Sequence, residues 1–399
     1  MPARRRRSLS QQNLATECEG ALGTLLADAL TIPRESAYRL THGFHPYPGR
    51  FHPRLVRTVL DELGGSPENN RGRTVLDPFM GGGTTLVEGN LLGLDVVGND
   101  LNPVAGLVAR ERTRPRTADQ ARRLVGEAER IAALVEALRR EKHPPRVRRP
   151  GLPRLAPHYA PHLFAELVQC IRLIDDLRAG TARETLRAVF SALAVKFSNR
   201  RSDSSEETEP PRYPKGAVIR FLVSKCQELA EAQVTLGERL PRPRPGVTLL
   251  EEDARLLPSL GWGAVDLILT SPPYPGTYDY HEHHRLRMDW LELDGQALFD
   301  GEAGPRRGEG VSWSAAMRDA MVAFARVMKR EGHLFVVIAD WLDRRHAVDG
   351  AAITLRIAQS KGWRCESRAS VQRAVHNRAE RTAFAKRGKW EHLLHFRRI

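Results

Sequence analysis

The stretch that decides the fold of this 399-residue chain runs Arg73-Thr74-Val75-Leu76-Asp77-Pro78-Phe79-Met80-Gly81-Gly82-Gly83-Thr84-Thr85. Its first five residues predict a short buried strand, and the glycines predict a tight turn that opens a helix over residues 86–92. A second strand is predicted over residues 96–100, ending on an acid. Strand, turn, helix and strand together predict a βαβ unit with a right-handed crossover.

The same α/β pattern continues in the last third of the chain. Strands are predicted over residues 247–250, 265–269, 332–338 and 391–396, and helices over residues 314–328 and 353–362. Between the two α/β parts the pattern is helical, over residues 118–142, 164–177, 185–197 and 217–240. We therefore predict one α/β domain, residues 41–112 and 246–399, interrupted by a helical insertion at residues 113–245.

Two further segments are less regular. Residues 1–40 are predicted to form a basic N-terminal arm and a helix, the latter from an amphipathic stretch over residues 15–30. Residues 275–310 are rich in glycine, histidine and aspartate, and we expect an irregular, mobile loop there.

The charge of the chain favours a polyanionic partner. Lys and Arg total 62 against 48 Asp and Glu, which gives a formal net charge of +14. The run Arg4–Arg7 fits an arm that touches nucleic acid, and it fits a solvated tail equally well. No run of eighteen apolar residues is present, so neither a transmembrane helix nor a membrane partner is expected.

Cysteine and histidine usage gives little support for a metal site, and none is predicted. The four cysteines form no CxxC pair, and scattered single cysteines are typical of a reducing cytoplasm. His281, His283 and His284 cluster beside Glu282, where a polar loop near a substrate is favoured over a metal site. Arg200 and Arg201 could contact DNA or lie in a solvated loop. Tyr278 and Tyr280 could assist base binding or pack the loop.

Acidic residues at strand ends suggest the ligand of the glycine turn. Asp77 precedes the turn, where a carboxylate suits a cationic group, and Asp100 could accept hydrogen bonds from both hydroxyls of a ribose. Asp253 could accept from an adenine amino group. Ribose, adenine and a charged amino-acid moiety describe S-adenosylmethionine, although the turn alone fits other nucleotide-binding enzymes as well.

The tetrapeptide Ser271-Pro272-Pro273-Tyr274 shifts this balance towards methyl transfer. It directly follows the predicted strand 265–269, so it lies at the same sheet edge as the glycine turn. Two prolines remove two N–H donors and leave a rim of acceptors, the Ser271 hydroxyl and backbone carbonyls. Such a rim would accept the protons of an exocyclic base amine and free its lone pair, while Tyr274 could stack on the base.

Four blocks of the sequence carry a resemblance to a known family. They are residues 44–53, the turn with Asp77, Phe79, Gly81, Gly83, Thr84 and Thr85, the stretch Gly98-Asn99-Asp100-Leu101-Asn102-Pro103 following Glu88, and residues 270–274. In this order they resemble the S-adenosylmethionine-dependent DNA amino methyltransferases, which make N4-methylcytosine or N6-methyladenine. The C-terminal stretch 390–396 resembles the closing strand of the same family.

The resemblance implies a fold, a cofactor and a set of site residues. The fold would be Rossmann-like, a mostly parallel seven-stranded sheet with an antiparallel C-terminal hairpin. The cofactor would be S-adenosylmethionine, held by Phe51, Pro53, Asp77, Phe79, Gly81, Gly83, Thr84, Thr85, Asp100, Asn102 and Asp253. Catalysis would use Ser271, Pro272, Pro273 and Tyr274.

The serine at 271 favours N4 of cytosine, because many adenine enzymes of the family carry aspartate there. The expected function is a site-specific duplex-DNA methyltransferase that flips the target base and transfers the methyl group directly. An N6-adenine DNA enzyme, an RNA guanine amino methyltransferase and a non-enzymatic DNA-binding protein are the alternatives. Methylation at cytosine C5 is not favoured, because that chemistry needs a thiolate nucleophile. The C5 family carries this cysteine after a proline, and none of the four cysteines here follows one.

The resemblance also implies partners. Double-stranded DNA would be the substrate, and residues 113–245 would contact it or recognise the target. A cognate restriction endonuclease, acting separately, is a candidate partner in a restriction-modification system. The expected location is the cytoplasm of a prokaryote, at the nucleoid.

Overall fold

The computed structural model describes residues 15–31, 39–141, 151–200, 212–275, 279–301, 312–375 and 378–399. Predictions for Arg4–Arg7, Arg201 and Tyr278 lie outside these residues. No helix of the described part is both long and apolar enough to cross a membrane.

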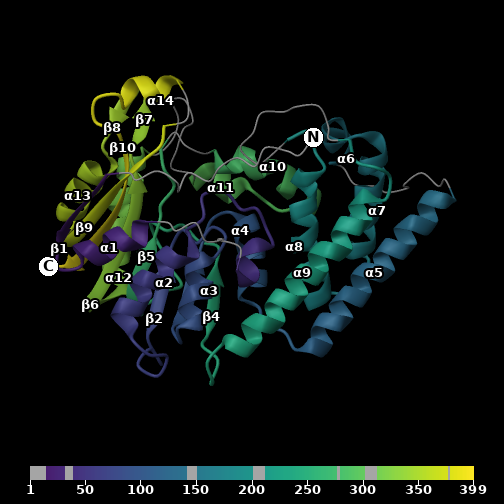
Figure 1. Ribbon diagram of the computed structural model, residues 1–399, viewed down its shortest axis with the longest axis horizontal. Coiled ribbons are helices and arrows are strands. Elements are labelled where there is room, and N and C mark those ends of the chain that lie inside the picture. Colours follow the sequence, from purple (N-terminus) through teal and green to yellow (C-terminus); the bar gives the residue numbers. More distant parts are fainter. Residues whose placement is uncertain are drawn as a thin grey trace.

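The centre of the fold is one eight-stranded sheet in the order β1-β9-β10-β6-β5-β2-β3-β4 (Figure 1). Its strands are β1 (Thr16–Gly20), β2 (Thr74–Asp77), β3 (Asp95–Asn99), β4 (Val247–Leu250), β5 (Val265–Thr270), β6 (Met328–Ala339), β9 (Trp363–Arg373) and β10 (Lys389–Arg398). Strands β6, β5, β2, β3 and β4 pair in parallel, whereas β9 and β10 form an antiparallel hairpin. The predicted Rossmann-like fold is confirmed. A two-stranded sheet, β7 (Trp341–Asp343) with β8 (His346–Val348), extends from β6.

Helices cover both faces of the sheet, and the alternation of apolar residues along each strand explains why. Val75 and Leu267 belong to a core cluster that includes helices α1 to α4, while their neighbours Leu76 and Ile268 belong to a second cluster with α12 and α13. A parallel strand buried on both faces needs such a continuous apolar run. The helices are α1 (Gly23–Leu30), α2 (Pro53–Gly64), α3 (Thr84–Leu91), α4 (Pro103–Thr113), α12 (Trp313–Val327) and α13 (Gly350–Gln359).

A group of helices extends the first core cluster away from the sheet, on the right of Figure 1. It contains α5 (Ala118–Arg140), α6 (Leu152–Leu155), α7 (Pro161–Asp175), α8 (Thr181–Lys196) and α9 (Ala217–Arg239). Helix α5 begins with a capping box between Thr117 and Gln120, and its buried positions Leu124, Ala128, Ile131 and Val135 recur every three or four residues. The short elements η2 (Leu40–Gly43), η3 (Ala156–His158) and α14 (Arg378–Ala383) complete the described chain.

Two sequence predictions of secondary structure are wrong. Only residues 23–30 of the amphipathic stretch 15–30 are helical, because Thr16–Gly20 pairs antiparallel with β9 and adds an eighth strand at the sheet edge. Gly20, with φ of 87°, ends that strand.

The irregular loop expected over residues 275–310 contains two helices, α10 (Tyr280–Leu291) and α11 (Gln296–Gly301). The buried residues of α10 include His284, Arg287, Met288 and Leu291, a helical spacing that its polar composition concealed.

Candidate active site

The carboxyl ends of β2, β3 and β5 border one pocket, as expected for ligand sites of open α/β sheets. The sequence-predicted residues that line it are Phe79, Gly81, Asp100, Asn102, Asp253, Ser271 and Pro273. Segments far apart in the sequence therefore meet at one edge of the sheet.

Two glycines of the turn after β2 have left-handed backbone conformations, with φ of 46° at Gly81 and 74° at Gly83. Gly81 lines the pocket, and its N–H donates to Asp100. Gly83 faces helix α4 instead, where an added methyl group would come within 2.9 Å of the Ala109 side chain. The two glycines thus have different roles. Gly81 lines the pocket, and Gly83 allows α3 to pack closely against α4.

Asp77 is buried and fully engaged by the protein. Its carboxylate accepts hydrogen bonds from Thr85 Oγ1 at 2.7 Å, Thr270 Oγ1 at 2.8 Å and the Phe79 N–H at 3.2 Å. Burial raises the pKa of Asp77 to about 6, against the opposing effect of these three donors. Asp77 therefore ties the glycine turn, the first turn of α3 and the end of β5 together.

Asp100 has a similar pKa but lies on the pocket wall. Its two carboxylate oxygens accept from the N–H groups of Gly81 and Asn102, each at 2.9 Å. Burial raises the pKa of Asp100 to about 6. Each oxygen has a further lone pair, so the carboxylate retains the capacity to accept from two adjacent hydroxyls of a ligand.

Asp253 lines the pocket beside its own cation. Arg255 donates to both carboxylate oxygens, with Nε at 2.9 and 2.8 Å. Hydrogen bonds and the charge of Arg255 lower the pKa of Asp253, although burial, the largest single influence, raises it. The Arg255 backbone N–H also donates to Oδ1 at 2.9 Å, so both oxygens of Asp253 are engaged by Arg255.

The tetrapeptide directly follows β5, and its Ser271 and Pro273 line the pocket. Ser271 Oγ donates to Tyr274 Oη at 3.2 Å, and the Tyr274 hydroxyl donates to Glu391 Oε1 of β10 at 3.4 Å. The Pro273 carbonyl accepts from the indole N–H of Trp313 at 2.8 Å. Burial raises the pKa of Tyr274 well above its ordinary value, so the phenol keeps its proton.

The other sequence-predicted site residues are not among those that line the pocket. They are Phe51, Pro53, Asp77, Gly83, Thr84, Thr85, Pro272 and Tyr274. Pro53 begins α2, and Phe51 packs against the first core cluster. The Thr84 hydroxyl is buried without a hydrogen-bond partner among the described residues, which leaves it able to bond a ligand.

Sequence reasoning missed much of the pocket lining. Tyr47 lies in the proline-rich stretch 44–53 and accepts at its hydroxyl from Asn102 Nδ2 at 3.0 Å. Trp313 and Met317 come from the first turns of α12, and Leu298 comes from α11. Only the stretch 44–53 carried a sequence signal, because helix periodicity does not distinguish pocket positions from core positions.

A buried arginine of α4 joins the two loops that form the pocket. Arg112 donates to the Gly82 carbonyl at 2.6 Å and to the His45 carbonyl at 2.8 Å. Burial lowers the pKa of Arg112 to about 9, so the guanidinium stays charged at neutral pH. The glycine turn and the 41–53 loop are thereby held in one position relative to each other.

The histidines of α10 pack against aromatic rings. The His284 ring lies 4.8 Å from that of Tyr47, and the His281 ring lies 5.1 Å from that of Phe299. Glu282 pairs with Arg200 at 2.9 Å, and the Arg200 side chain is only 9% exposed. Arg200 therefore joins α10 to the end of α8.

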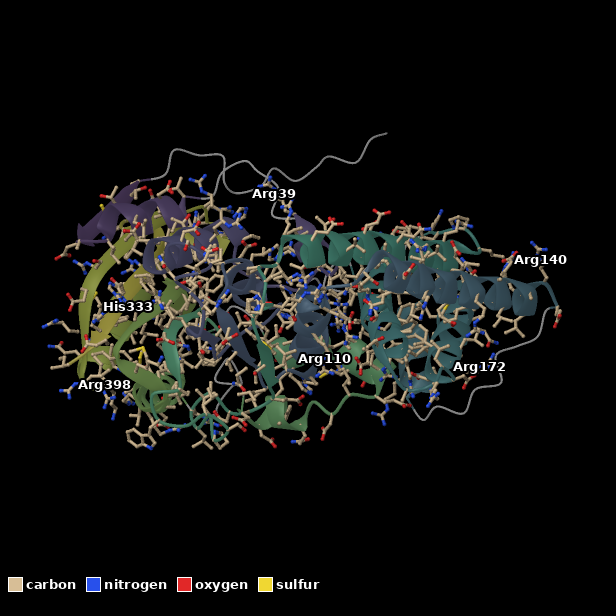
Figure 2. The ribbon with its side chains drawn as sticks, turned by 90° about the horizontal axis from the view of Figure 1, so that it is seen from below. Arg39, Arg110, Arg140, Arg172, His333 and Arg398 are labelled. Carbon is tan, nitrogen blue, oxygen red and sulfur yellow. The ribbon has the colours of Figure 1, made fainter. Side chains whose placement is uncertain are left out.

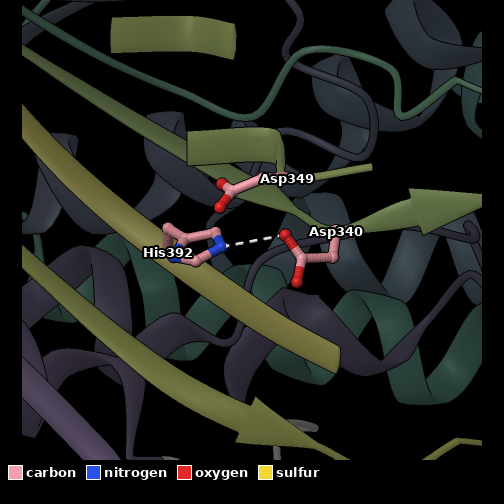
Figure 3. A group of neighbouring side chains, drawn as sticks. All are labelled: Asp340, Asp349 and His392. Atoms are coloured by element: carbon pink, nitrogen blue, oxygen red, sulfur yellow. Dashed lines mark hydrogen bonds and ion pairs between the residues drawn. The ribbon is translucent and has the colours of Figure 1, made fainter. Parts of the chain in front are cut away.

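Potential metal ligands come together elsewhere among the described residues, at Asp340, Asp349 and His392 (Figure 3). Arg387 pairs with Asp340 at 2.7 Å and with Asp349 at 3.5 Å. Asp340 also accepts from His392 at 3.2 Å and from the Gly350 N–H at 3.0 Å. The cluster thus has its own cation and hydrogen-bond donors, and it connects β6 with β10.

Basic side chains are spread over the whole molecule. Figure 2 shows labelled arginines from Arg398 at the sheet, through Arg110, to Arg140 and Arg172 at the helical end. Arg140 pairs with Glu136 at 3.0 Å, and Arg172 pairs with Asp176 at 3.1 Å. Charge alone therefore does not single out one side for a polyanion.

Sequence comparison relates the chain to type II methyltransferases. It is similar to M.MjaII of Methanocaldococcus jannaschii, with 22% identity over 388 residues covering 75% of this chain and 72% of that protein. It is similar to M.MvaI of Kocuria varians, with 23% identity over 269 residues covering 64% of this chain and 58% of that protein. M.BsoBI of Geobacillus stearothermophilus is 36% identical over 64 residues, which cover 16% of this chain and 12% of that protein.

Solved methyltransferase structures are more distantly similar. The rRNA methyltransferase aviRa from Streptomyces viridochromogenes has a TM-score of 0.34 at 14% identity, covering 92% of this chain and 94% of that chain. A geranyl diphosphate methyltransferase in complex with GPP and sinefungin has a TM-score of 0.36 at 9% identity, covering 88% and 80%. No protein-family model matches the chain. The curated homologues of this chain are type II DNA methyltransferases, in agreement with the DNA amino methyltransferase family that its motifs resemble.

Proposed function

We propose that the chain transfers a methyl group from S-adenosylmethionine to N4 of cytosine in duplex DNA. The observation that carries the proposal is the position of the tetrapeptide 271–274, of which Ser271 and Pro273 line the pocket beside Asp100 and Gly81. Homology to type II DNA methyltransferases supports DNA as the substrate.

The donor set of the pocket fits S-adenosylmethionine. Asp100 can accept from the two ribose hydroxyls, and apolar surface is supplied by Phe79 and Met317. Asp253 would accept from the adenine amine in place of one of its contacts with Arg255. The buried hydroxyl of Thr84 is available for one further hydrogen bond. When bound, the cofactor supplies an electrophilic methyl group on a sulfonium.

The remaining cofactor residues act by position. Phe51 and Pro53, at the start of α2, would close the methionine end of the site. Gly83 and Thr85 would surround the cofactor through the turn and the first turn of α3, which Asp77 fixes in place.

Ser271 and the prolines then act on the target base. Once the cytosine has left the duplex, Ser271 Oγ can accept a hydrogen bond from an N–H of the exocyclic amine. This hydrogen bond favours a lone pair localised on the amine nitrogen over one delocalised into the ring. The two prolines rigidify this acceptor, and the Tyr274 ring would flank the base. Direct transfer needs this positioning and a pocket that excludes water.

The positions of the cysteines argue against a covalent route at cytosine C5. Cys170 and Cys226 are buried in the helical part, and burial raises the pKa of the Cys226 thiol to about 12. Cys18 and Cys365 lie on β1 and β9. None of the four lines the pocket, so the site provides no thiolate nucleophile.

The helices between α4 and β4 are the proposed DNA-contacting and target-recognition part. Two of them, α6 and α8, contact α10, whose Tyr280 lines the pocket. A separate restriction endonuclease would share the recognised sequence.

The decisive experiment is mass spectrometry of nucleosides after incubation of the protein with S-adenosylmethionine and unmethylated genomic DNA. We expect N4-methylcytosine. N6-methyladenine would keep the pocket assignment but refute the interpretation of Ser271, and methylation of RNA alone would refute the substrate.

A matched pair of variants links the activity to the site. Ser271→Ala should lower turnover about 100-fold or more while S-adenosylmethionine still binds. Ser360→Ala, a serine at the end of α13 that donates to the Ile357 carbonyl, should behave as wild type. Loss of cofactor binding in Ser271→Ala would contradict the role assigned to this residue.

A further inference from the structure

The hydroxyl groups of the tetrapeptide are the start of a line of side chains that leaves the pocket. Ser271 Oγ donates to Tyr274 Oη, Tyr274 Oη donates to Glu391 Oε1, and Arg373 donates to Glu391 Oε2 through Nε at 2.8 Å and Nη2 at 2.6 Å. The line runs from the loop after β5 across to β10 and β9.

The direction of donation along this line matters. Because the Ser271 proton points to Tyr274, the lone pairs of Ser271 Oγ are left to accept from a group in the pocket. Because Tyr274 keeps its proton, it can donate to a carboxylate while it accepts from Ser271. Each hydroxyl is thus oriented by the next group, and the last group is an anion.

Glu391 is divided between its two partners. Arg373 occupies Oε2 twice, whereas Oε1 faces Tyr274. Arg373 is itself anchored, since Nη2 also donates to the Leu30 carbonyl at 3.0 Å. The side chains of Glu391 and Arg373 are 23% and 21% exposed, so the ion pair lies in a partly desolvated position.

We propose that Glu391, held by Arg373, is the positioning residue that orients Tyr274 and Ser271 and the terminal acceptor of the proton released from the methylated amine. This inference rests on the proposed function. As the nitrogen–carbon bond forms and the sulfur–carbon bond breaks, the amine acquires a positive charge and must lose one proton. That proton passes to Ser271 Oγ as the serine proton moves to Tyr274 and the tyrosine proton moves to Glu391, so both hydroxyls end neutral.

The acids that line the pocket, Asp100, Glu252 and Asp253, are less suited to this role. Glu252 accepts from the Ser259 hydroxyl. Asp253 is engaged by Arg255, and Asp100 is engaged by two backbone N–H groups. The hydrogen bonds that leave Ser271 lead through Tyr274 to Glu391.

The test is a double-mutant cycle of Glu391→Gln and Tyr274→Phe, with Glu19→Gln as the matched control. Gln keeps the shape of Glu391 but removes its charge, and Phe removes only the Tyr274 hydroxyl. Glu19 forms a more exposed pair with Arg368 at 2.6 Å, between β1 and β9. Single-turnover methylation of duplex DNA, and the affinities for S-adenosylmethionine and DNA, are measured for each protein.

We expect each single variant to lower the rate about 100-fold, the double variant to lower it no further, and both affinities to stay within about twofold of wild type. Glu19→Gln should match the wild type. Any of three results would overturn the inference: a wild-type rate in Glu391→Gln, additive losses in the double variant, or loss of cofactor affinity in a variant. The proposed function would still stand in these cases, provided that the wild-type protein methylates DNA. Absence of transfer by the wild-type protein would refute the proposed function itself, and the inference with it.

Discussion

Strands β2 and β3 lie side by side, β2 ends at Asp77 and β3 ends just before Asp100. The two aspartates have nearly equal pKa values, yet their side chains are held differently. Asp77 accepts from two threonine hydroxyls and one N–H, all within the protein. Asp100 accepts from two N–H groups and lines the pocket. Burial and pKa therefore do not distinguish the two aspartates. They differ in that Asp100 lines the pocket whereas Asp77 does not.

The largest expected effect belongs to Asp77. Asp77→Ala should lower the free energy of unfolding by about 2–4 kcal/mol, because two buried hydroxyls and one N–H lose their acceptor. Urea unfolding followed by circular dichroism measures this. If Asp77→Ala is as stable as wild type but binds no S-adenosylmethionine, the structural role of Asp77 is refuted and Asp77 is the ligand contact.

Asp100→Ala should affect binding more than stability. Loss of two charge-assisted hydrogen bonds to a ribose predicts a Kd for S-adenosylmethionine raised about 10- to 100-fold, measured by calorimetry. The control is Asp95→Ala at the other end of β3, where the carboxylate accepts from the Gly246 N–H at 2.6 Å outside the pocket. Equal losses of affinity in both variants would contradict the assignment of Asp100.

The raised pKa values predict opposite pH effects on stability and on binding. A carboxyl whose folded pKa is about 6 and whose ordinary value is 3.8 binds its proton more tightly when folded, so it stabilises the ligand-free fold as the pH falls through 6. Binding of a ribose and a sulfonium instead favours the carboxylate of Asp100. The Kd should therefore rise by up to about tenfold per pH unit below pH 6.

Titration calorimetry between pH 5 and 8 checks this, and Asp100→Ala should flatten the profile. An unchanged Kd at pH 5 would show that the ligand does not need an ionised acceptor at Asp100.

The smallest expected effect is that of Thr270→Val on the free energy of unfolding, and it tests whether Asp77 has a structural role only. Thr270→Val removes the hydroxyl that joins β5 to Asp77 at 2.8 Å and preserves the side-chain shape. We expect a loss of about 1 kcal/mol in the free energy of unfolding and an unchanged Kd for S-adenosylmethionine. A clear loss of affinity would instead place the end of β5 in direct control of the cofactor.

The elements of the fold were largely predictable from the sequence because each strand and long helix has its own apolar period. Three consecutive glycines predicted the turn at residues 81–83. Two prolines after a buried strand marked residues 271–274 as a site candidate. Strand β1 could not be predicted, since all five of its residues are exposed and it exists only through backbone pairing with β9. Helix α10 was missed because its buried positions include His284 and Arg287, which are polar.

The site was only partly predictable, for a related reason. Asp100 and Ser271 stand out because an acid or a serine at a strand end must face the sheet edge. No such signal marks Trp313, Arg112 or Glu391. Each lies in an ordinary helix or strand, 30 to 117 residues away in sequence from the group that it contacts.

By itself the sequence determined the α/β fold, the edge of the sheet at which the pocket lies and the position of the tetrapeptide at that edge. These follow from local periodicity and from residue types with restricted backbones. Only the tertiary structure decided that Asp77 supports the pocket whereas Asp100 lines it. It also decided that Arg112 joins the two loops of the pocket, and that Ser271 is linked to Glu391 through Tyr274. Hydrogen bonds between distant segments depend on the packing of the whole sheet, and no local pattern in the chain encodes them.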